Sequence, residues 1–470
     1  MDATVNKNYM KGFIPFAMAA ALVSLAGGFT ASIPNNIVSA WQLDPSWLTW
    51  ITLSMSMGMA ACAPVLGKLG DIFGRRGASL VGMALMAIGE LAIGIAPDGM
   101  VWMVIIGRFV VGVGAAAISP TVIAYITSEF PPAKMGNGFA VYAALSSGMV
   151  IFGPTIGGII FQTTQNWRLI LYICAALAAL CFVVGLFTMK KETGPKKGMS
   201  GFDVFGGIFI ILFFSLALCV PNLAQGTAGW LGTSTLVVLG AAVVCLVILF
   251  VAEKKAKNPI LNGKFMARKQ FILPVVVLFL TQGLMQACMT NTIRFAMMFD
   301  PTTSVASYAT SIMYVGMTIG NIVVAPLANK KEPRIVSVCA LVFCLVGAAL
   351  QLLYTAESGF VMFAASLFFI GLGLGGNTTI FMNVALSGLD PQIAGAGSGT
   401  YTVFRDLSAP FGVAVFVPMF TNAIQYEASG APVATSIVTS MHSVAWVQIV
   451  CVVVGMVVCL LLPKIHNKKA

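Results

Sequence analysis

The chain is 470 residues long, and 59% of its residues are hydrophobic while only 9% are charged. A soluble domain carries about 25% charged residues, so this composition excludes a soluble fold. The net charge of +11 would suggest a nucleic-acid partner in a soluble protein, but lysines and arginines also orient membrane proteins. One bilayer crossing takes roughly 20 apolar residues, which leaves room for about 14 crossings and no separate soluble domain.

Apolar runs between charged or turn-rich breaks predict the membrane helices in chain order. The first set is expected at residues 12–38, 47–66, 78–97, 101–127, 137–161, 168–188 and 204–223. The second set is expected at residues 232–252, 271–294, 306–328, 334–354, 358–386, 396–424 and 441–462. The first run is too long for the apolar part of a cleaved signal peptide, so we expect this helix to stay in the mature protein.

The basic residues predict the orientation of these helices. With an even number of helices both termini lie on one side, and that side holds all but four of the 26 lysines and arginines. Positive side chains near helix ends resist translocation, so we expect both termini to be cytoplasmic in a multi-pass protein of the cytoplasmic membrane. The four exceptions are Arg108, Arg168, Arg294 and Arg405. This asymmetry accounts for the net charge without a nucleic acid.

A faint internal repeat predicts the domain organisation. The repeated positions are Pro64 and Pro326, Arg75 and Arg334, and Pro154 and Pro410. Each pair is shifted by eight predicted helices. We therefore expect two six-helix bundles, residues 1–190 and 266–470, joined by residues 191–265 with two additional helices. Paired bundles around a site near the middle of the membrane are typical of secondary transporters.

The most specific motif lies between the second and third predicted helices. It consists of Gly67, Asp71, Gly74, Arg75 and Arg76. The glycines allow a tight turn with close helix approach, and Asp71 can bond helix N-terminal amides or a neighbouring arginine. Since orientation alone requires neither Asp71 nor the glycine spacing, we interpret these residues as a gating motif that closes the cytoplasmic side and releases it during transport.

This motif resembles the loop signature of the major facilitator superfamily. Arg108, followed by glycines in the fourth predicted helix, is similar to a family motif whose arginine is implicated in proton coupling. The fifth predicted helix carries a pattern that resembles the helix-packing motif of antiporters. Its residues are Gly153, Pro154, Gly157 and Gly158. Residues 202–206, 225–230 and 258–261 resemble the 14-helix drug:proton antiporter family.

The resemblance covers nearly the whole chain and implies both fold and function. It implies an all-α membrane protein with the major facilitator fold, two six-helix bundles and two additional central helices. It also implies a proton-coupled secondary transporter that exports small amphipathic organic compounds by alternating access, as multidrug efflux proteins do. Such a carrier uses the proton gradient and no cofactor. Its partners would be the substrate, protons and membrane lipids, and we expect a monomer.

One departure from that family leaves an alternative open. The drug exporters usually carry an aspartate in the first helix, whereas residues 25–34 contain no acid here. An acid there suits cationic drugs. Some relatives are proton-dependent importers of amphipathic anions such as bile acids, and the chain resembles those as well. Import of an amphipathic organic anion is therefore the second hypothesis.

Ionisable residues inside a bilayer are costly and point to function. Glu90 in the third predicted helix and Asp406 in the thirteenth are candidates for the proton carrier, together with Arg108. Either carboxylate has an equally plausible structural role, in which it is bound to a nearby arginine or backbone group.

Polar side chains inside the predicted helices are candidates for the substrate cavity. Gln282, Gln286, Thr290 and Arg294 recur every four residues and so share one face of a helix. They either line the cavity or bond neighbouring helices. The weaker candidates are Asn377, Tyr401 and Arg405.

The remaining residues argue against other classes of function. The chain has 10 cysteines, all within apolar runs, which we interpret as core residues. Its 2 histidines make a metal site very unfavourable. A channel would leave Asp71 unexplained, and an enzyme would need a catalytic cluster that the sequence lacks.

Overall fold

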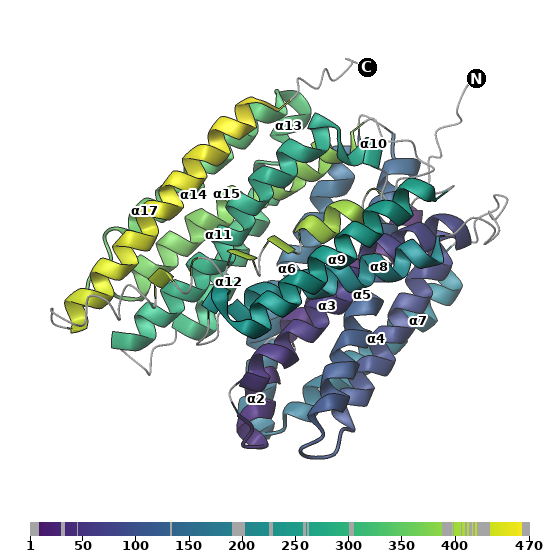
Figure 1. Ribbon diagram of the computed structural model, residues 1–470, viewed down its shortest axis with the longest axis horizontal. Coiled ribbons are helices and arrows are strands. Elements are labelled where there is room, and N and C mark those ends of the chain that lie inside the picture. Colours follow the sequence, from purple (N-terminus) through teal and green to yellow (C-terminus); the bar gives the residue numbers. More distant parts are fainter. Residues whose placement is uncertain are drawn as a thin grey trace. The chain divides into compact units, whose positions relative to one another are not determined.

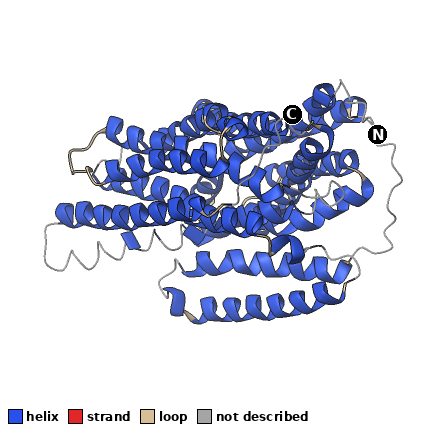
Figure 2. Cartoon of the chain, turned by 90° about the horizontal axis from the view of Figure 1, so that it is seen from above, coloured by secondary structure: helices blue, strands red, loops and turns tan. Residues whose placement is uncertain are grey.

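The computed structural model describes residues 9–29, 33–44, 46–131, 134–189, 203–224, 229–256, 260, 263–299, 305–387, 397, 399–405, 407–408, 411–412, 416, 419–420 and 433–462. Within these residues every regular element is a helix, as Figure 2 shows. The all-α prediction is therefore confirmed.

The helices follow the apolar runs of the sequence (Figure 1). The first are α1 (Tyr9–Phe29), α2 (Ile33–Ala40), α3 (Ser46–Phe73), α4 (Arg75–Gly94), α5 (Val101–Glu129), α6 (Met135–Thr164), α7 (Trp167–Thr188), α8 (Val204–Ala224) and α9 (Thr233–Lys255). After them come α10 (Gly263–Met266), α11 (Lys269–Phe299), α12 (Val305–Val323), α13 (Leu327–Lys330), α14 (Pro333–Gln351), α15 (Phe360–Leu386) and α17 (Val433–Leu460). A 3-10 turn, Gly229–Leu231, precedes α9.

Contacts between Cα atoms divide the chain into two compact units. Unit 1 comprises Met1–Val220, Thr233–Met266 and Gly388–Asp406. Unit 2 comprises Pro221–Gly232, Ala267–Ser387 and Leu407–Ala470. In unit 1, α5 packs against both α3 and α4, and in unit 2, α15 packs against both α12 and α14. Each unit is thus built around one central helix.

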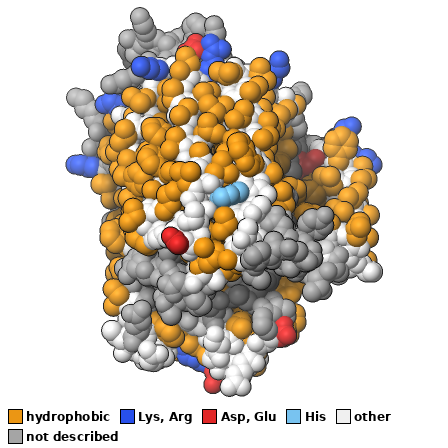
Figure 3. Space-filling model, turned by 90° about the vertical axis from the view of Figure 1, so that its left-hand side faces the viewer, with side chains coloured by type: hydrophobic (Ala, Val, Ile, Leu, Met, Phe, Trp, Pro, Cys, Tyr) orange, Lys and Arg blue, Asp and Glu red, His pale blue; other side chains and the backbone are white. Residues whose placement is uncertain are grey.

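Length and composition make most of these helices suitable for crossing a membrane. Among the described residues, 11 helices meet both requirements, and the shorter stretches Val204–Val220 and Ser311–Val323 are apolar as well. Many large apolar side chains are exposed, and Figure 3 shows hydrophobic side chains over much of the face in view. Such a surface is favourable in lipid rather than in water. The helix expected at 396–424 is described only in part, and its described residues are helical.

Several predicted boundaries differ from the structure, including the start of the last helix, which was expected at 441 and lies at Val433. The run at 12–38 is described as two helices, α1 and α2, with residues 30–32 outside the described part. The helix expected to end at 66 continues to Phe73, and Gly74 with φ of 97° turns the chain directly into α4. Side chains with a Cβ rarely adopt that φ. The helix expected at 306–328 ends at Val323, because Pro326 and the turn around it start the separate helix α13.

Candidate functional site

The crossing of α3 and α5 fixes the position of Arg108. A Cβ added at Gly58 would meet the carbonyl oxygen of Phe109, and one added at Gly112 would meet the carbonyl oxygen of Met55. The two backbones are therefore in contact, as small residues allow in membrane helices. Arg108 lies one turn before Gly112, so this crossing sets its place beside α3.

A second crossing, between α4 and α5, fixes the position of Glu90. A Cβ added at Gly114 would lie 2.6 Å from the carbonyl oxygen of Gly82, and one added at Gly89 would lie 2.8 Å from that of Gly107. These contacts are two turns apart on each helix and hold the helices together over that length. Glu90 directly follows Gly89, so its side chain starts at this close contact.

Glu90 and Arg108 are buried together inside unit 1. Glu90 is 2% exposed and Arg108 is 6% exposed. The Oε2 atom of Glu90 and the Nε atom of Arg108 are buried without a hydrogen-bond partner, and Arg108 Nη2 donates a weak bond to Met55 Sδ at 3.8 Å. The two charges interact electrostatically. A buried anion with an unsatisfied oxygen is costly, so the chemistry this pair offers is proton binding at Glu90 with Arg108 as the balancing cation.

The same helix crossings recur in unit 2 without the charges. A Cβ added at Gly371 would meet the carbonyl oxygen of Met313, which corresponds to the contact of Gly112 with Met55. A Cβ added at Gly347 would lie 2.7 Å from the carbonyl oxygen of Ser366, which corresponds to the contact of Gly89 with Gly107. The equivalent numbers differ by 258 or 259. By this correspondence, Ala348 stands where unit 1 has Glu90, and Leu367 stands where unit 1 has Arg108. Both replacements are buried. The ionisable pair is therefore specific to one copy of a repeated framework.

The two arginines of the gating motif bind partners within unit 1. Arg75 Nη1 donates to Ser128 Oγ at 2.6 Å and lies 3.8 Å from Glu129 Oε1, at the end of α5. Arg76 Nη2 donates to the Leu186 carbonyl oxygen at 2.7 Å, in the last turn of α7. A cation there stabilises the carbonyl end of a helix. The arginines thus join the start of α4 to the ends of α5 and α7.

Gly67 and Asp71 belong to α3 rather than to a loop. The side chain of Asp71 lies outside the described part of the structure. Gly74 supplies the turn that the sequence predicted, since it is the only residue between the two helices and its φ is 97°. The motif therefore joins two helices almost without a loop, and the contact assigned to Asp71 stays a prediction.

The sequence profile of the Major Facilitator Superfamily matches residues 16–413. The chain belongs to this superfamily. Membership points to a transporter rather than to an enzyme, and the apolar helices make this transporter a multi-pass membrane protein.

Several curated relatives of the transporter are drug-resistance proteins. It is 23% identical to Multidrug resistance protein 3 of Bacillus subtilis (strain 168) over 92% of this chain and 84% of the relative. It is 26% identical to Multidrug resistance protein Stp of Mycobacterium tuberculosis (strain CDC 1551 / Oshkosh), over 81% of this chain and 70% of the relative. It is also 26% identical to the Tetracenomycin C resistance and export protein of Streptomyces glaucescens, over 80% of this chain and 69% of the relative.

Solved structures confirm the fold of the transporter. The human organic anion transporter MFSD10 (TETRAN) superposes with a TM-score of 0.66 at 13% identity, covering 96% of this chain and 99% of that chain. The E. coli fucose:proton symporter FucP superposes with a TM-score of 0.64 at 14% identity, covering 98% of this chain and 100% of that chain. Both are membrane transporters of the predicted fold.

The predicted cavity residues of the transporter fall into different surroundings. On α11, Gln282 and Thr290 are half-buried and Arg294 is exposed, while the side chain of Gln286 lies outside the described part. Asn377 on α15 is fully buried and its Nδ2 donates to the Ser337 carbonyl oxygen of α14 at 3.3 Å. That bond joins two helices of unit 2.

The last predicted residues are only partly described. Tyr401 is fully buried and Arg405 is half-buried, whereas Asp406 lies outside the described residues. In α6, Gly153 and Gly157 are buried, as expected for a helix-packing motif. The side chain of Pro154 and the surroundings of Gly158 lie outside the described part of the structure. Of the two candidate proton carriers, Glu90 and Asp406, only Glu90 lies among the described residues.

Sequence reasoning missed several buried polar side chains in unit 2. Gln351 Nε2 donates to Thr292 Oγ1 at 3.4 Å, and both residues are fully buried. Gln448 on α17 is also fully buried, and neither polar atom of its amide has a hydrogen-bond partner. A glutamine inside an apolar run was the available signal, because a polar group in lipid needs a partner inside the protein.

The sequence analysis also missed a group of hydrogen-bonded side chains that joins several segments at one end of unit 1. Asp98 Oδ1 accepts hydrogen bonds from Trp41 Nε1 at 2.8 Å and from Arg168 Nη2 at 2.6 Å. Arg168 Nη1 also donates to the Gly94 carbonyl oxygen at 3.1 Å. Arg168, whose place at a helix end the sequence predicted, therefore joins the start of α7 to the end of α4.

Proposed function

We propose that this transporter is a proton-coupled exporter of small amphipathic organic compounds. It works by alternating access in the cytoplasmic membrane, with both termini in the cytoplasm. It acts as a monomer and needs the proton gradient but no cofactor and no nucleic acid. The names of its curated relatives support efflux, because they include multidrug resistance proteins and an export protein.

One observation carries the proton-coupled part of this proposal. Glu90 is buried with an oxygen that lacks a hydrogen-bond partner, and Arg108 interacts with it from the neighbouring helix. A proton on Glu90 removes the unsatisfied anion. Loss of that proton leaves two opposite charges that attract each other more strongly. Proton binding therefore changes the force between α4 and α5, and this is the change that we assign to the transport cycle.

Import of an amphipathic organic anion is the second candidate. The described first helix, Tyr9–Phe29, contains no Asp or Glu. An acid in that helix would favour a cationic substrate. Arg294 on α11 is exposed, and a cation there favours an anion instead. This candidate keeps the same proton site but reverses the direction in which proton and substrate move relative to each other.

Transport into proteoliposomes distinguishes the two candidates. An exporter that exchanges protons for substrate accumulates a permanently charged lipophilic cation when the vesicle lumen is acidic. An importer that carries protons with substrate accumulates a bile salt when the outside is acidic. A protonophore abolishes either accumulation, and protein-free vesicles give the background. Accumulation that is unchanged by the protonophore contradicts proton coupling.

The gating motif gives a separate prediction. We expect Asp71→Asn to lower the transport rate by about tenfold or more, which is within the usual range of coupling energies. The reason is that the variant keeps the shape of Asp71 but removes the charge that we assign to closing the cytoplasmic side. The measurement is the initial transport rate in proteoliposomes with matched protein content.

The matched control is Glu129→Gln at the same end of unit 1. Glu129 is exposed and lies 3.8 Å from Arg75, and exposed pairs contribute little, about 0 to 1 kcal/mol. We therefore expect this variant to transport nearly as fast as the unmodified protein. If Asp71→Asn transports at the same rate as the unmodified protein, the gating role of Asp71 is wrong.

A further inference from the structure

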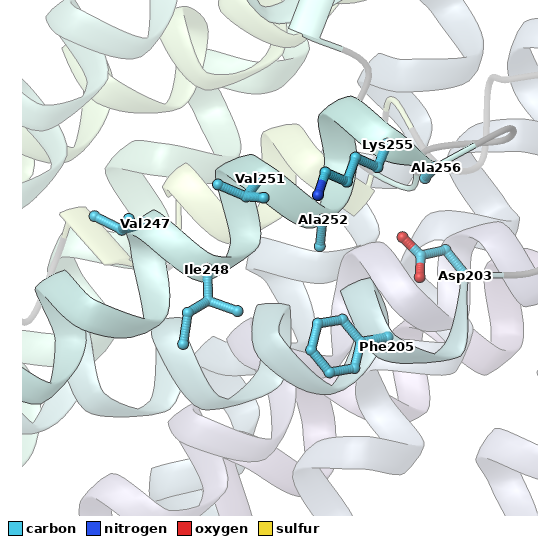
Figure 4. A pocket seen from close by; sticks show the side chains of 8 residues that line it. All are labelled: Asp203, Phe205, Val247, Ile248, Val251, Ala252, Lys255 and Ala256. Carbon is cyan, nitrogen blue, oxygen red and sulfur yellow. The ribbon is translucent and has the colours of Figure 1, made fainter.

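The hairpin of α8 and α9 carries a pocket that the proposed transport function does not use. The pocket has a volume of about 510 Å³ and lies entirely within unit 1. Its walls are apolar, and Figure 4 shows Phe205 on one side and Val247, Ile248 and Val251 on the other. Phe205 is 57% exposed and Val247 is 58% exposed. The pocket is therefore open at the surface of two membrane helices, where lipid chains are the available apolar molecules.

Opposite charges lie at one end of this pocket. Asp203 directly precedes α8, and Lys255 is in the last turn of α9. Figure 4 shows both side chains beside the apolar walls, approaching from different helices. Asp203 Oδ1 accepts the backbone N–H of Gly206 at 2.7 Å, while Asp203 Oδ2 is buried and has no hydrogen-bond partner. One acceptor of the carboxylate is thus unused.

We propose that this pocket binds a phospholipid with a primary ammonium headgroup, namely phosphatidylethanolamine. Its acyl chain packs against Phe205, Val247 and Val251, its ammonium donates to Asp203 Oδ2, and its phosphate pairs with Lys255. The pocket thus matches all three parts of the lipid. On the orientation proposed above, the charged end faces the cytoplasm, so the lipid comes from the inner leaflet.

The charges of the pocket favour this headgroup over others. Phosphatidylglycerol offers a phosphate to Lys255 but brings no cation to Asp203, whose negative charge then repels it. Phosphatidylcholine brings a cation without N–H donors, so Asp203 Oδ2 stays without a hydrogen bond. A buried acceptor without a donor costs free energy, and a charge-assisted bond removes that cost. Of these three headgroups, only ethanolamine satisfies both charged residues and the unused acceptor.

Native mass spectrometry of the full-length protein in mild detergent tests this proposal. The protein is offered an equimolar mixture of phosphatidylethanolamine, phosphatidylcholine and phosphatidylglycerol with identical acyl chains. We expect the ethanolamine lipid to be retained about fivefold more than the choline lipid, the factor that corresponds to about 1 kcal/mol for a partly exposed pair. N-methylated ethanolamine lipids should lose this advantage as their N–H donors are removed.

Two variants and one control assign the effect to the pocket. Asp203→Asn keeps an oxygen that can cap Gly206 but replaces the acceptor Oδ2 with an NH2 group, which cannot accept a hydrogen bond, so we expect the ethanolamine preference over choline to disappear. Lys255→Gln should lower the retention of both lipids. Lys254→Gln is the matched control, because Lys254 lies over the Phe250 ring at 4.3 Å and does not line the pocket. It should bind lipid as the unmodified protein does.

The proposal is overturned if the unmodified protein retains the three lipids equally, or if Asp203→Asn keeps the full preference. A lipid effect that Lys254→Gln abolishes as strongly as Lys255→Gln would also overturn it, since the site would then be a diffuse basic surface. Lipid retention is measured without transport. Failure of the proposed transport function therefore leaves this result unaffected.

Discussion

Glu90→Gln is expected to abolish uphill transport while leaving downhill exchange of substrate in place. The amide keeps the size and the hydrogen-bonding oxygen of Glu90 but cannot exchange a proton. A gradient of about one pH unit stores about 1.4 kcal/mol per proton, which supports about tenfold accumulation when one proton moves per substrate. The accumulation ratio should therefore fall to about one in this variant, while exchange of labelled for unlabelled substrate continues.

The control for this experiment is Glu357→Gln. Glu357 is an exposed acid in the connection between α14 and α15, so its loss should leave accumulation unchanged. Both variants are compared at equal amounts of reconstituted protein. Normal accumulation in Glu90→Gln would show that the proton is carried elsewhere, and Asp406 would then be the next carboxylate to replace. Loss of both accumulation and exchange would point to a structural role for Glu90.

Gly112→Ala is expected to destabilise the protein strongly although it adds a single methyl group. The added Cβ would meet the Met55 carbonyl oxygen and would lie 2.9 Å from the Met59 backbone nitrogen. Both are main-chain atoms of α3, so they cannot move aside as the end of a side chain can. Overpacking of this kind costs about 1 to 3 kcal/mol, and we expect the Tm in detergent to fall by about 5 °C.

Gly240→Ala on α9 is expected to leave the thermal stability unchanged or to raise it. No heavy atom lies within 4 Å of a Cβ added at Gly240. Alanine is about 1 kcal/mol more favourable than glycine inside a helix, so the Tm should stay the same or rise slightly. A thermal denaturation series on the two variants measures both effects. If Gly112→Ala is as stable as Gly240→Ala, then α3 and α5 do not cross at backbone contact.

The helices were largely predictable because a bilayer crossing needs a long apolar run. The runs at 101–127 and 168–188 correspond closely to α5 and α7. The end of α3 was not predictable from hydropathy, since residues 67–73 are mixed in polarity and yet remain helical. The glycines of the motif predict a tight turn, but the sequence does not say which glycine makes it, and the φ of 97° assigns the turn to Gly74.

The surroundings of the ionisable residues were harder to predict than their presence. Glu90 and Arg108 stand out in sequence because charges are rare inside membrane helices. Their mutual approach depends on the crossing of α4 and α5, which hydropathy does not encode. Likewise, nothing in the sequence distinguishes Asn377, which bonds a neighbouring helix at Ser337, from a residue that lines a cavity. That difference depends on which side of α15 each neighbour occupies.

The repeated crossings bear on how such a protein can evolve. Ala348 and Leu367 occupy the places of Glu90 and Arg108 in an otherwise equivalent framework, and both are apolar residues that fit their surroundings. A duplicated ancestor could therefore gain an ionisable pair in one copy, or lose it from the other, without disturbing how the helices are assembled. A functional difference between the two copies would then require only a few substitutions, which natural selection could accumulate one at a time.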